Sequence, residues 1–211
     1  RQTPEVLFEA FRKDPQKHPL KTPSGKIEIF SKTVAEFGYA DCPGHPVWHA
    51  PAEWLGAADC PWPLHLLSNQ PRTKLHSQLD QGAVSAAAKI NGHETVTIHP
   101  SDAATRQISA GDVVRIFNTR GAILAGAIIS DKIRQGVVLV PTGAWFDPDL
   151  ETPGLCKHGN PNVLAPDQPT SRLAQGPAAH SCMVEIVAIS GNDLPEVTAH
   201  HPPEISKART S

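Results

Sequence analysis

Residues 157–186, KHGNPNVLAPDQPTSRLAQGPAAHSCMVEI, form a long stretch of mostly small, polar and turn-forming residues. A loop of that length without a periodic apolar pattern is uncommon in a compact domain, and is usually either functional or disordered. This stretch carries few charges and leads directly into residues 183–187, whose alternation is typical of a strand. We therefore expect an ordered loop whose backbone and amide side chains bind a polar ligand.

A second polar segment, residues 68–78 (SNQPRTKLHSQ), follows a short apolar run that predicts a buried strand. Ligands often bind where strands end. Arg72, Lys74, His76 and Ser77 can donate hydrogen bonds to a phosphate group, the first two with the help of their charge. The same composition also suits an exposed polar loop that binds nothing.

Metal and hydrolase chemistry find little support in the sequence. The chain has 11 histidines and 4 cysteines but neither a CxxC nor an HExxH motif. His45 and His49 have HxxxH spacing, but Pro46 between them disfavours a helical pair on one face. We expect no zinc or iron site made of protein ligands, four reduced cysteines and, because GxSxG is absent, no serine hydrolase.

The overall composition argues against several classes of protein. A formal net charge of -2 over 211 residues gives no basic field, so we expect no nucleic-acid or membrane-surface binding. No apolar run approaches the ~20 residues that a membrane-spanning helix needs. The first residues, RQTPEVLFEAFRKDP, lack an initiator methionine and an apolar signal segment, so we expect an upstream portion.

The first sixty or so residues are expected to hold few regular elements. Thr3 and Pro4 suit the start of an amphipathic helix over residues 3–12. Residues 22–31, TPSGKIEIFS, predict a turn and a short strand. Residues 41–63 contain many prolines and three of the four tryptophans, which is typical of a connector pinned to a surface by aromatic anchors.

The rest of the chain alternates short apolar strands with tight turns. A small helix is expected at residues 100–104 and a helical turn at 131–135. Strands are predicted over residues 64–68, 94–99, 113–118, 122–130, 137–140 and 183–187. With 21 prolines and 15 glycines, helix cannot dominate, so the pattern predicts a mainly β barrel with short helices (α+β).

The chain resembles the C-terminal domain of the bacterial dimethyl sulfoxide reductase family, especially its biotin sulfoxide and trimethylamine N-oxide reductase branch. The resemblance covers roughly residues 20–190 and rests on the order of SNQP, RTKLHSQ, HPSDA, GDVVRIFNTRG, VPTGAWFDP, KHGNPNVL and TSRLAQGPAAHS. It implies a six-stranded double-psi β-barrel with long ligand-binding loops. The domains expected are a lead-in over 1–61 that belongs partly to an upstream domain, a dinucleotide-binding barrel over 62–190 and a flexible tail over 191–211.

The resemblance also implies a cofactor, molybdenum bis(molybdopterin guanine dinucleotide), and residues that bind it. One group lies in the loop after the first barrel strand, at positions that contact the dinucleotides or stand beside them. These residues are Ser68, Asn69, Gln70, Lys74, Leu75, His76, Ser77 and Gln78.

A second group lies in the long polar stretch. Asn162 matches an asparagine that hydrogen-bonds the pterin side of the cofactor. Ala179 and His180 match a Gly-Gln-like pair that approaches a pterin, and here an imidazole replaces the amide. Trp145 is expected either to stack on the ligand or to pack. His158 and its neighbour Lys157 could line the site or be exposed.

The implied function is to cap the cofactor of a molybdenum-dependent S-oxide or N-oxide reductase, an enzyme of oxygen-atom transfer. The implied partners are the upstream catalytic domains, or a subunit, of that reductase and a small-molecule oxide. The metal ligand, a serine in this branch, lies upstream, so no residue here is expected to be catalytic, and the chain alone is not expected to be active. Cytoplasmic and periplasmic members share the domain, which leaves the compartment open.

The alternative is a non-catalytic double-psi barrel that serves as a binding or assembly module without a cofactor. The loop residues discriminate between these readings, because a pure interaction module has no reason to keep SNQP, RTKLHSQ and KHGNPN together.

Overall fold

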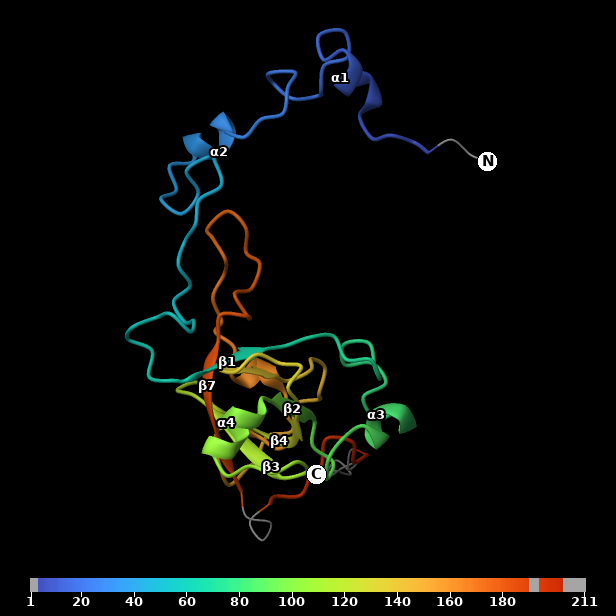
Figure 1. The fold of residues 1–211 in the computed structure, drawn as a ribbon, viewed down its shortest axis with the longest axis vertical. Helices are drawn as coiled ribbons and strands as arrows, with labels where there is room; N and C mark the ends of the chain where they lie inside the picture. The colour runs from blue at the N-terminus through green and yellow to red at the C-terminus, as the bar shows by residue number, and fades with distance from the viewer. Residues whose placement is uncertain (1–3, 190–193, 203–211) are drawn as a thin grey trace, which may run out of the picture. The chain divides into compact units, whose positions relative to one another are not determined.

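The computed structural model describes residues 4–189 and 194–202 and divides the chain into two compact units (Figure 1). The first unit comprises residues 1–50 and 169–176, and the second comprises 51–168 and 177–211. None of the helices in the described part of the chain is long and apolar enough to cross a membrane.

The second unit is built on a closed β-barrel. Its strands are β1 (Leu64–Leu67), β2 (Thr95–Ile98), β3 (Val113–Phe117), β4 (Ala122–Ile129), β5 (Val137–Leu139), β6 (Leu155–Cys156) and β7 (Met183–Ala188). Six of them pair in the order β2-β5-β1-β7-β3-β4, and β4 pairs back to β2, while β6 extends the sheet beside β4. The pairs β1–β5 and β2–β4 are parallel, and the other pairs of the ring are antiparallel. The predicted mainly β, six-stranded double-psi barrel is confirmed.

The helices are short. The first unit contains α1 (Glu9–Lys13) and α2 (Lys32–Glu36), and the second contains α3 (Ala83–Ala87), α4 (Pro100–Thr105) and the 3-10 turn η1 (Pro161–Val163). The predicted helix after residue 99 is therefore present. Pro100 occupies its first turn, where a missing N–H costs nothing, and the His99 side chain accepts a hydrogen bond from the backbone N–H of Ser101.

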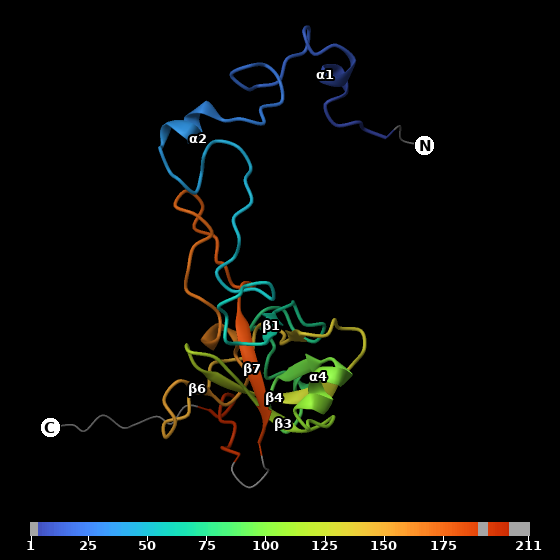
Figure 2. The same ribbon diagram turned by 60° about the vertical axis from the view of Figure 1, so that its left-hand side comes forward.

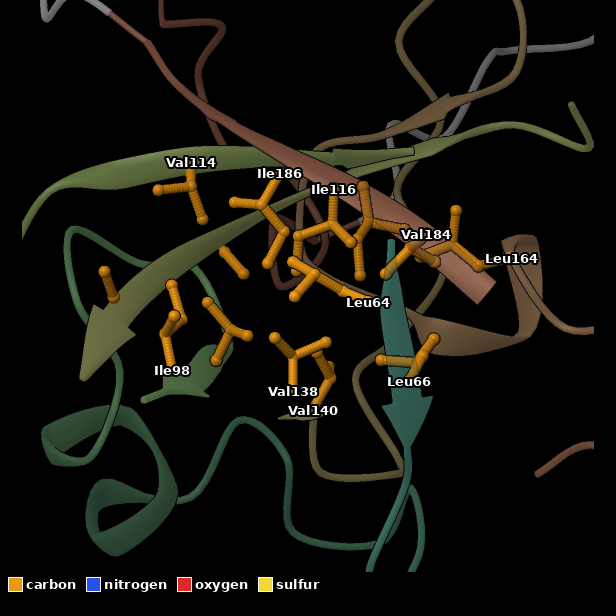
Figure 3. Packing of buried hydrophobic residues seen from close by; sticks show 14 of the residues in the cluster. Leu64, Leu66, Ile98, Val114, Ile116, Val138, Val140, Leu164, Val184 and Ile186 are labelled. Atoms are coloured by element: carbon orange, nitrogen blue, oxygen red, sulfur yellow. The ribbon is translucent and has the colours of Figure 1, made fainter. Parts of the chain in front are cut away.

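The barrel interior is filled by alternate residues of the strands (Figure 3). Leu64 and Leu66 of β1 project into it, as do side chains from β2, β3, β5 and β7. β4 departs from this alternation, because residues 122–127 are all buried between neighbouring strands and packed segments. Small residues are needed there: a Cβ added to Gly126 would lie 2.2 Å from the Cβ of Ile90.

Residues 51–61 belong with the barrel, although the predicted boundary placed them in the lead-in. The guanidinium of Arg120 donates to both carboxylate oxygens of Glu53, at 2.5 and 2.9 Å. The backbone N–H of Met183 donates to the same carboxylate at 2.8 Å. These bonds lower the pKa of Glu53, because the hydrogen bond from Arg120 outweighs the cost of burial. The connector is thus held by an ion pair as well as by Trp62, which packs edge-on against Phe117.

Two predictions for the first unit are wrong. The helix begins at Glu9 and not near residue 3, and Phe8 before it has a left-handed backbone at φ 57. Residues 22–31 form turns and bends rather than a strand. The apolar side chains that suggested these elements are largely exposed, with Leu7 at 74% and Ile29 at 78%. Without a buried face to stabilise it, the alternating pattern does not produce a strand.

Two further expectations fail in the second unit. Residues 131–135 form turns and no helix. Part of the predicted flexible tail is held in place, because Thr198 and His200 make hydrogen bonds to side chains of the barrel unit. The remaining residues of the tail, with residues 1–3, lie outside the described part of the chain.

Asn118 joins three segments of the barrel unit and gives a direct test of the fold. Its buried amide donates to the carbonyls of Leu164 at 3.0 Å and Met183 at 3.1 Å, and its Oδ1 accepts from the N–H of Arg120. The change Asn118→Ala is expected to lower the free energy of unfolding by about 2 kcal/mol, because buried carbonyls lose their donors. Urea denaturation measures this, and Thr119→Ala on the exposed turn is the control. Equal effects of the two changes would contradict the role of Asn118.

Candidate functional site

Two loops leave the barrel at the same end. β1 and β5 are parallel neighbours, so the loops that follow Leu67 and Leu139 emerge side by side. Backbone hydrogen bonds continue beyond the strands, from Val140 N to Leu67 O at 3.0 Å and from Thr142 N to Asn69 O at 2.9 Å. The loop predicted to bind a ligand is therefore supported along its base by the loop after β5.

Residues 74–78 form a tight turn that closes on itself. The N–H of Gln78 donates to the carbonyl of Leu75 at 2.9 Å, and the amide of Gln70 donates to the carbonyl of Lys74, also at 2.9 Å. His76, at the tip, has a positive φ of 50°. The carbonyl groups at the base of the turn are thus engaged within the loop itself.

The loop after β5 lies against two further carbonyls of the turn, those of His76 and Ser77. The indole Nε1 of Trp145 donates to the carbonyl of Ser77 at 2.7 Å. The carbonyl of His76 faces Gly143, where an added Cβ would lie only 1.7 Å from the oxygen. With these carbonyls turned towards the protein, the side chains of His76, Ser77 and Gln78 are exposed. The turn therefore presents a row of polar side chains outward.

A buried ionic cluster holds the base of this loop. The ammonium of Lys74 donates to Asp80 at 2.6 Å and also to Glu94, and the ammonium of Lys89 lies 2.9 Å from Asp80 and 3.4 Å from Glu94. Burial disfavours the charged forms, but the hydrogen bonds outweigh it. They raise the pKa of Lys74 and hold the pKa of Asp80 far below its ordinary value.

This cluster changes the role expected for Lys74. Its side chain has no exposed surface and its ammonium is shared between two carboxylates, so it does not face outward to donate to a phosphate. The two carboxylates that bind Lys74 belong to Asp80 and Glu94, which follow it by 6 and 20 residues in the sequence. A contact between Lys74 and a ligand at this surface would have to come from its backbone.

The second predicted group lies at the same end of the barrel. β1 and β7 are antiparallel, which brings the residues before β7 next to those after β1. Nε2 of His65 donates to the carbonyl of His180 at 2.6 Å, and the N–H of Leu66 donates to the carbonyl of Cys182 at 2.9 Å. His180 is exposed and Ala179 is half-buried, as is Ser68.

Asn162 is exposed on η1, whose first turn is capped by the side chain of Asn160. The thiol of Cys182 donates to the carbonyl of Leu164 at 3.1 Å, which ties this turn to the start of β7. The structure thus brings the segments of both predicted groups to the end of the barrel where β1 ends and β7 begins. Asn69, Gln70 and Leu75 are also exposed there.

His158 and Lys157 are buried, which excludes the exposed-loop interpretation. Lys157 donates to Thr198 Oγ1 at 3.0 Å and lies 3.4 Å from Asp147. Nδ1 of His158 donates to the carbonyl of Trp145 at 3.1 Å, and burial lowers the pKa of this imidazole to about 4. His158 is therefore neutral at pH 7.

One group of side chains has the composition of a metal site. Ligand atoms of Asp80, His158 and His200 lie within 4.8 Å of one another. Lys74 and Lys89, however, already neutralise the carboxylates of Asp80 and Glu94. A divalent cation would add two uncompensated charges to a buried site, which is strongly unfavourable. We interpret the group as part of the ionic cluster.

Sequence reasoning missed several residues that shape the site. Asp80 lies two positions beyond the predicted loop, and His200 lies in a segment expected to be flexible. Trp145 had two interpretations, and its hydrogen bond to Ser77 shows that it packs against the loop. The Thr142-Gly143 pair after β5 indicates a turn, so a close backbone approach at Gly143 could have been expected. The sequence does not indicate that the approaching group is the carbonyl of His76.

Gly143 offers a test of how closely the two loops approach. Gly143 and Gly111 have similar positive φ values of 95° and 90°, but a Cβ on Gly111 meets nothing within 4 Å. Both Gly→Ala changes strain the backbone, and Gly143→Ala also forces the His76 carbonyl to move. We expect Gly143→Ala to cost at least ~1 kcal/mol more in urea denaturation. We also expect it to shift the amide resonances of residues 75–78. Equal costs and unchanged resonances would contradict the close approach.

Comparison with known proteins agrees with this architecture. The family model of the molydopterin dinucleotide binding domain matches residues 64–183. The trimethylamine-N-oxide reductase of Salmonella typhi is 47% identical over 203 residues, which are 94% of this chain and 24% of that protein. The biotin sulfoxide reductase of Cereibacter sphaeroides is 48% identical over 192 residues, 90% of this chain and 25% of that protein.

A solved structure extends the comparison of the fold. The acetylene hydratase from Pelobacter acetylenicus superimposes with a TM-score of 0.65 at 18% identity, over 82% of this chain and 25% of that one. The chain thus spans about a quarter of the length of the curated relatives it matches. The matched residues include β1 to β6, the first residue of β7 and the loops that follow β1 and β5. The chain belongs to the molydopterin dinucleotide binding domain family.

Proposed function

We propose that this chain binds molybdenum bis(molybdopterin guanine dinucleotide) and caps this cofactor in a reductase that acts on an S-oxide or an N-oxide. The observation that carries the proposal is the turn at residues 74–78, whose carbonyls face the protein and whose polar side chains face outward. The family match and relatives named as trimethylamine-N-oxide and biotin sulfoxide reductases support it.

The residues present suit a ligand of this kind. A pterin guanine dinucleotide offers phosphate oxygens and heterocycle edges that carry donors and acceptors, so it needs hydroxyl, amide and imidazole groups opposite. The exposed end of the barrel supplies these from His76, Ser77, Gln78 and Asn162. Because Lys74 is occupied in the ionic cluster, the exposed Arg72 is the loop side chain suited to charge-assisted binding of phosphate.

When bound, such a cofactor supplies the molybdenum centre at which an oxygen atom leaves the oxide substrate. The chain itself binds the cofactor, orients it and covers it. The turn at residues 74–78 and the polar segments around Asn162 and His180 hold the dinucleotide in place. No residue of this chain is assigned a chemical step.

A larger assembly is part of the proposal. Several large apolar side chains near the site loop and in the loop after β5 are exposed: Leu75 at 56%, Leu79 at 71%, Val84 at 70%, Phe146 at 60% and Leu150 at 92%. An apolar surface of this kind favours contact with another protein domain. The relatives, of which this chain spans about a quarter, supply the obvious candidate, namely the upstream catalytic domains of the same reductase.

The test uses one change in each of the two predicted groups of binding residues. His76→Ala and Asn162→Ala are each expected to weaken retention of the cofactor about tenfold, because each removes a hydrogen bond that orients a charged ligand. Substrate preference is expected to stay the same. The measurement is molybdenum and acid-released GMP per chain, on protein purified from cells that make molybdopterin cofactors.

The matched control is Gln135→Ala. Gln135 is exposed and precedes β5, so it lies at the opposite end of the parallel strands from the loops. Its removal is expected to leave the content of metal and GMP unchanged. Full molybdenum and GMP content in both site variants would contradict the assignment of these residues. Absence of both from the unaltered protein would favour the alternative, a barrel that serves as an interaction module.

A further inference from the structure

Residues 194–202, here called the strap, follow the last barrel strand and lie outside the segment matched by the family model (red in Figures 1 and 2). Thr198 fixes the strap to Asp147: its N–H donates to Oδ2 and its hydroxyl donates to Oδ1, both at 2.7 Å. The N–H of Ala199 adds a bond to the same carboxylate at 3.1 Å. These bonds lower the pKa of Asp147 in spite of its burial, so the anchor is an ionised carboxylate at neutral pH.

The strap also delivers His200 to the ionic cluster. Nε2 of His200 donates to Oδ2 of Asp80 at 2.9 Å. Its ring lies edge-on to the rings of Trp145 and His158, with centroids 5.2 and 4.8 Å away. Since 26% of its side chain is exposed, His200 closes the cluster on the solvent side.

Asp80 connects this contact to the site loop. One carboxylate oxygen, Oδ1, binds the ammonium groups of Lys74 and Lys89. The other, Oδ2, accepts from His200 at 2.9 Å and from the N–H of Trp145 at 3.2 Å. Asp80 therefore holds Lys74, at the base of the turn, and Trp145, whose indole holds the carbonyl of Ser77.

A chain of contacts thus runs from the strap to the outward-facing side chains of the turn. The links at Asp80 span 2.6 to 3.2 Å and are buried or half-buried, whereas the last bond, from Trp145 to Ser77, lies at the surface. A buried carboxylate that loses one of its donors is destabilised. We propose that the strap is a clamp that holds the turn at residues 74–78 in its binding conformation, with His200 as a positioning residue that acts through Asp80. The effect on cofactor binding rests on the proposed function, whereas the effect on the turn does not.

The first test is hydrogen exchange on the full chain. His200→Ala is expected to speed exchange of the hydrogen-bonded amides of Gln78 and Trp145 about tenfold, because local opening becomes easier. Amides of the barrel core, such as that of Ile116 in β3, are expected to keep their rates. The control is His201→Ala, since the neighbouring His201 is exposed and pairs only loosely with Glu196, at 3.8 Å.

A conservative variant separates positioning from bulk stability. The amide of His200→Gln can still donate to Asp80, so this variant is expected to restore most of the slow exchange. Unchanged exchange of the Gln78 and Trp145 amides in His200→Ala would overturn the proposal. An equal rise in the turn and in the barrel core would also overturn it, because the strap would then act only on global stability.

Cofactor content gives the second readout. In protein from cells that make molybdopterin cofactors, His200→Ala is expected to retain several-fold less GMP than the unaltered protein, and His201→Ala the same amount. Fast exchange in the turn together with full GMP content would overturn the link between strap and ligand. Fast exchange together with no GMP in any variant would support the clamp and contradict the proposed function instead.

Discussion

Asp80 has no exposed surface, and a buried carboxylate is stable only while its oxygens keep their donors. Its donors come from four parts of the second unit: Lys74 in the site loop, Lys89 after α3, Trp145 after β5 and His200 in the strap. The need to satisfy one charge therefore ties together segments that are far apart in the sequence. The conformation of the exposed loop therefore depends on the buried hydrogen bonds of Asp80 beneath it.

The barrel provides the base for this arrangement. Because β1 and β5 run in parallel, the loops after them leave at the same end and can share hydrogen bonds. The antiparallel pairing of β1 with β7 brings the segment around His180 to the same place. The domain therefore contributes a fixed arrangement of loops and hydrogen-bonding groups at one end of the barrel. A domain that caps a reactive cofactor needs such a fixed arrangement, since the chemistry belongs to the cofactor.

The barrel strands could be predicted from the sequence because each is a short apolar run bounded by glycine or polar turns. The strand expected around Ile29 failed, since the same local pattern has no buried face there. Lys74 could not be placed either. Its residue type suits a phosphate, and only the tertiary contact with Asp80 and Glu94 shows that its charge is already used. His200 was missed because tail composition says nothing about a contact with a residue 120 positions earlier.

The central claim is that this chain holds a molybdenum dinucleotide cofactor. Its most direct test is the molybdenum and acid-released GMP content of the protein purified from its native source, with the intact mass read on the same sample. We expect molybdenum together with GMP, on a polypeptide or complex several times larger than this chain. A single chain of about 22.6 kDa with neither metal nor nucleotide would contradict it.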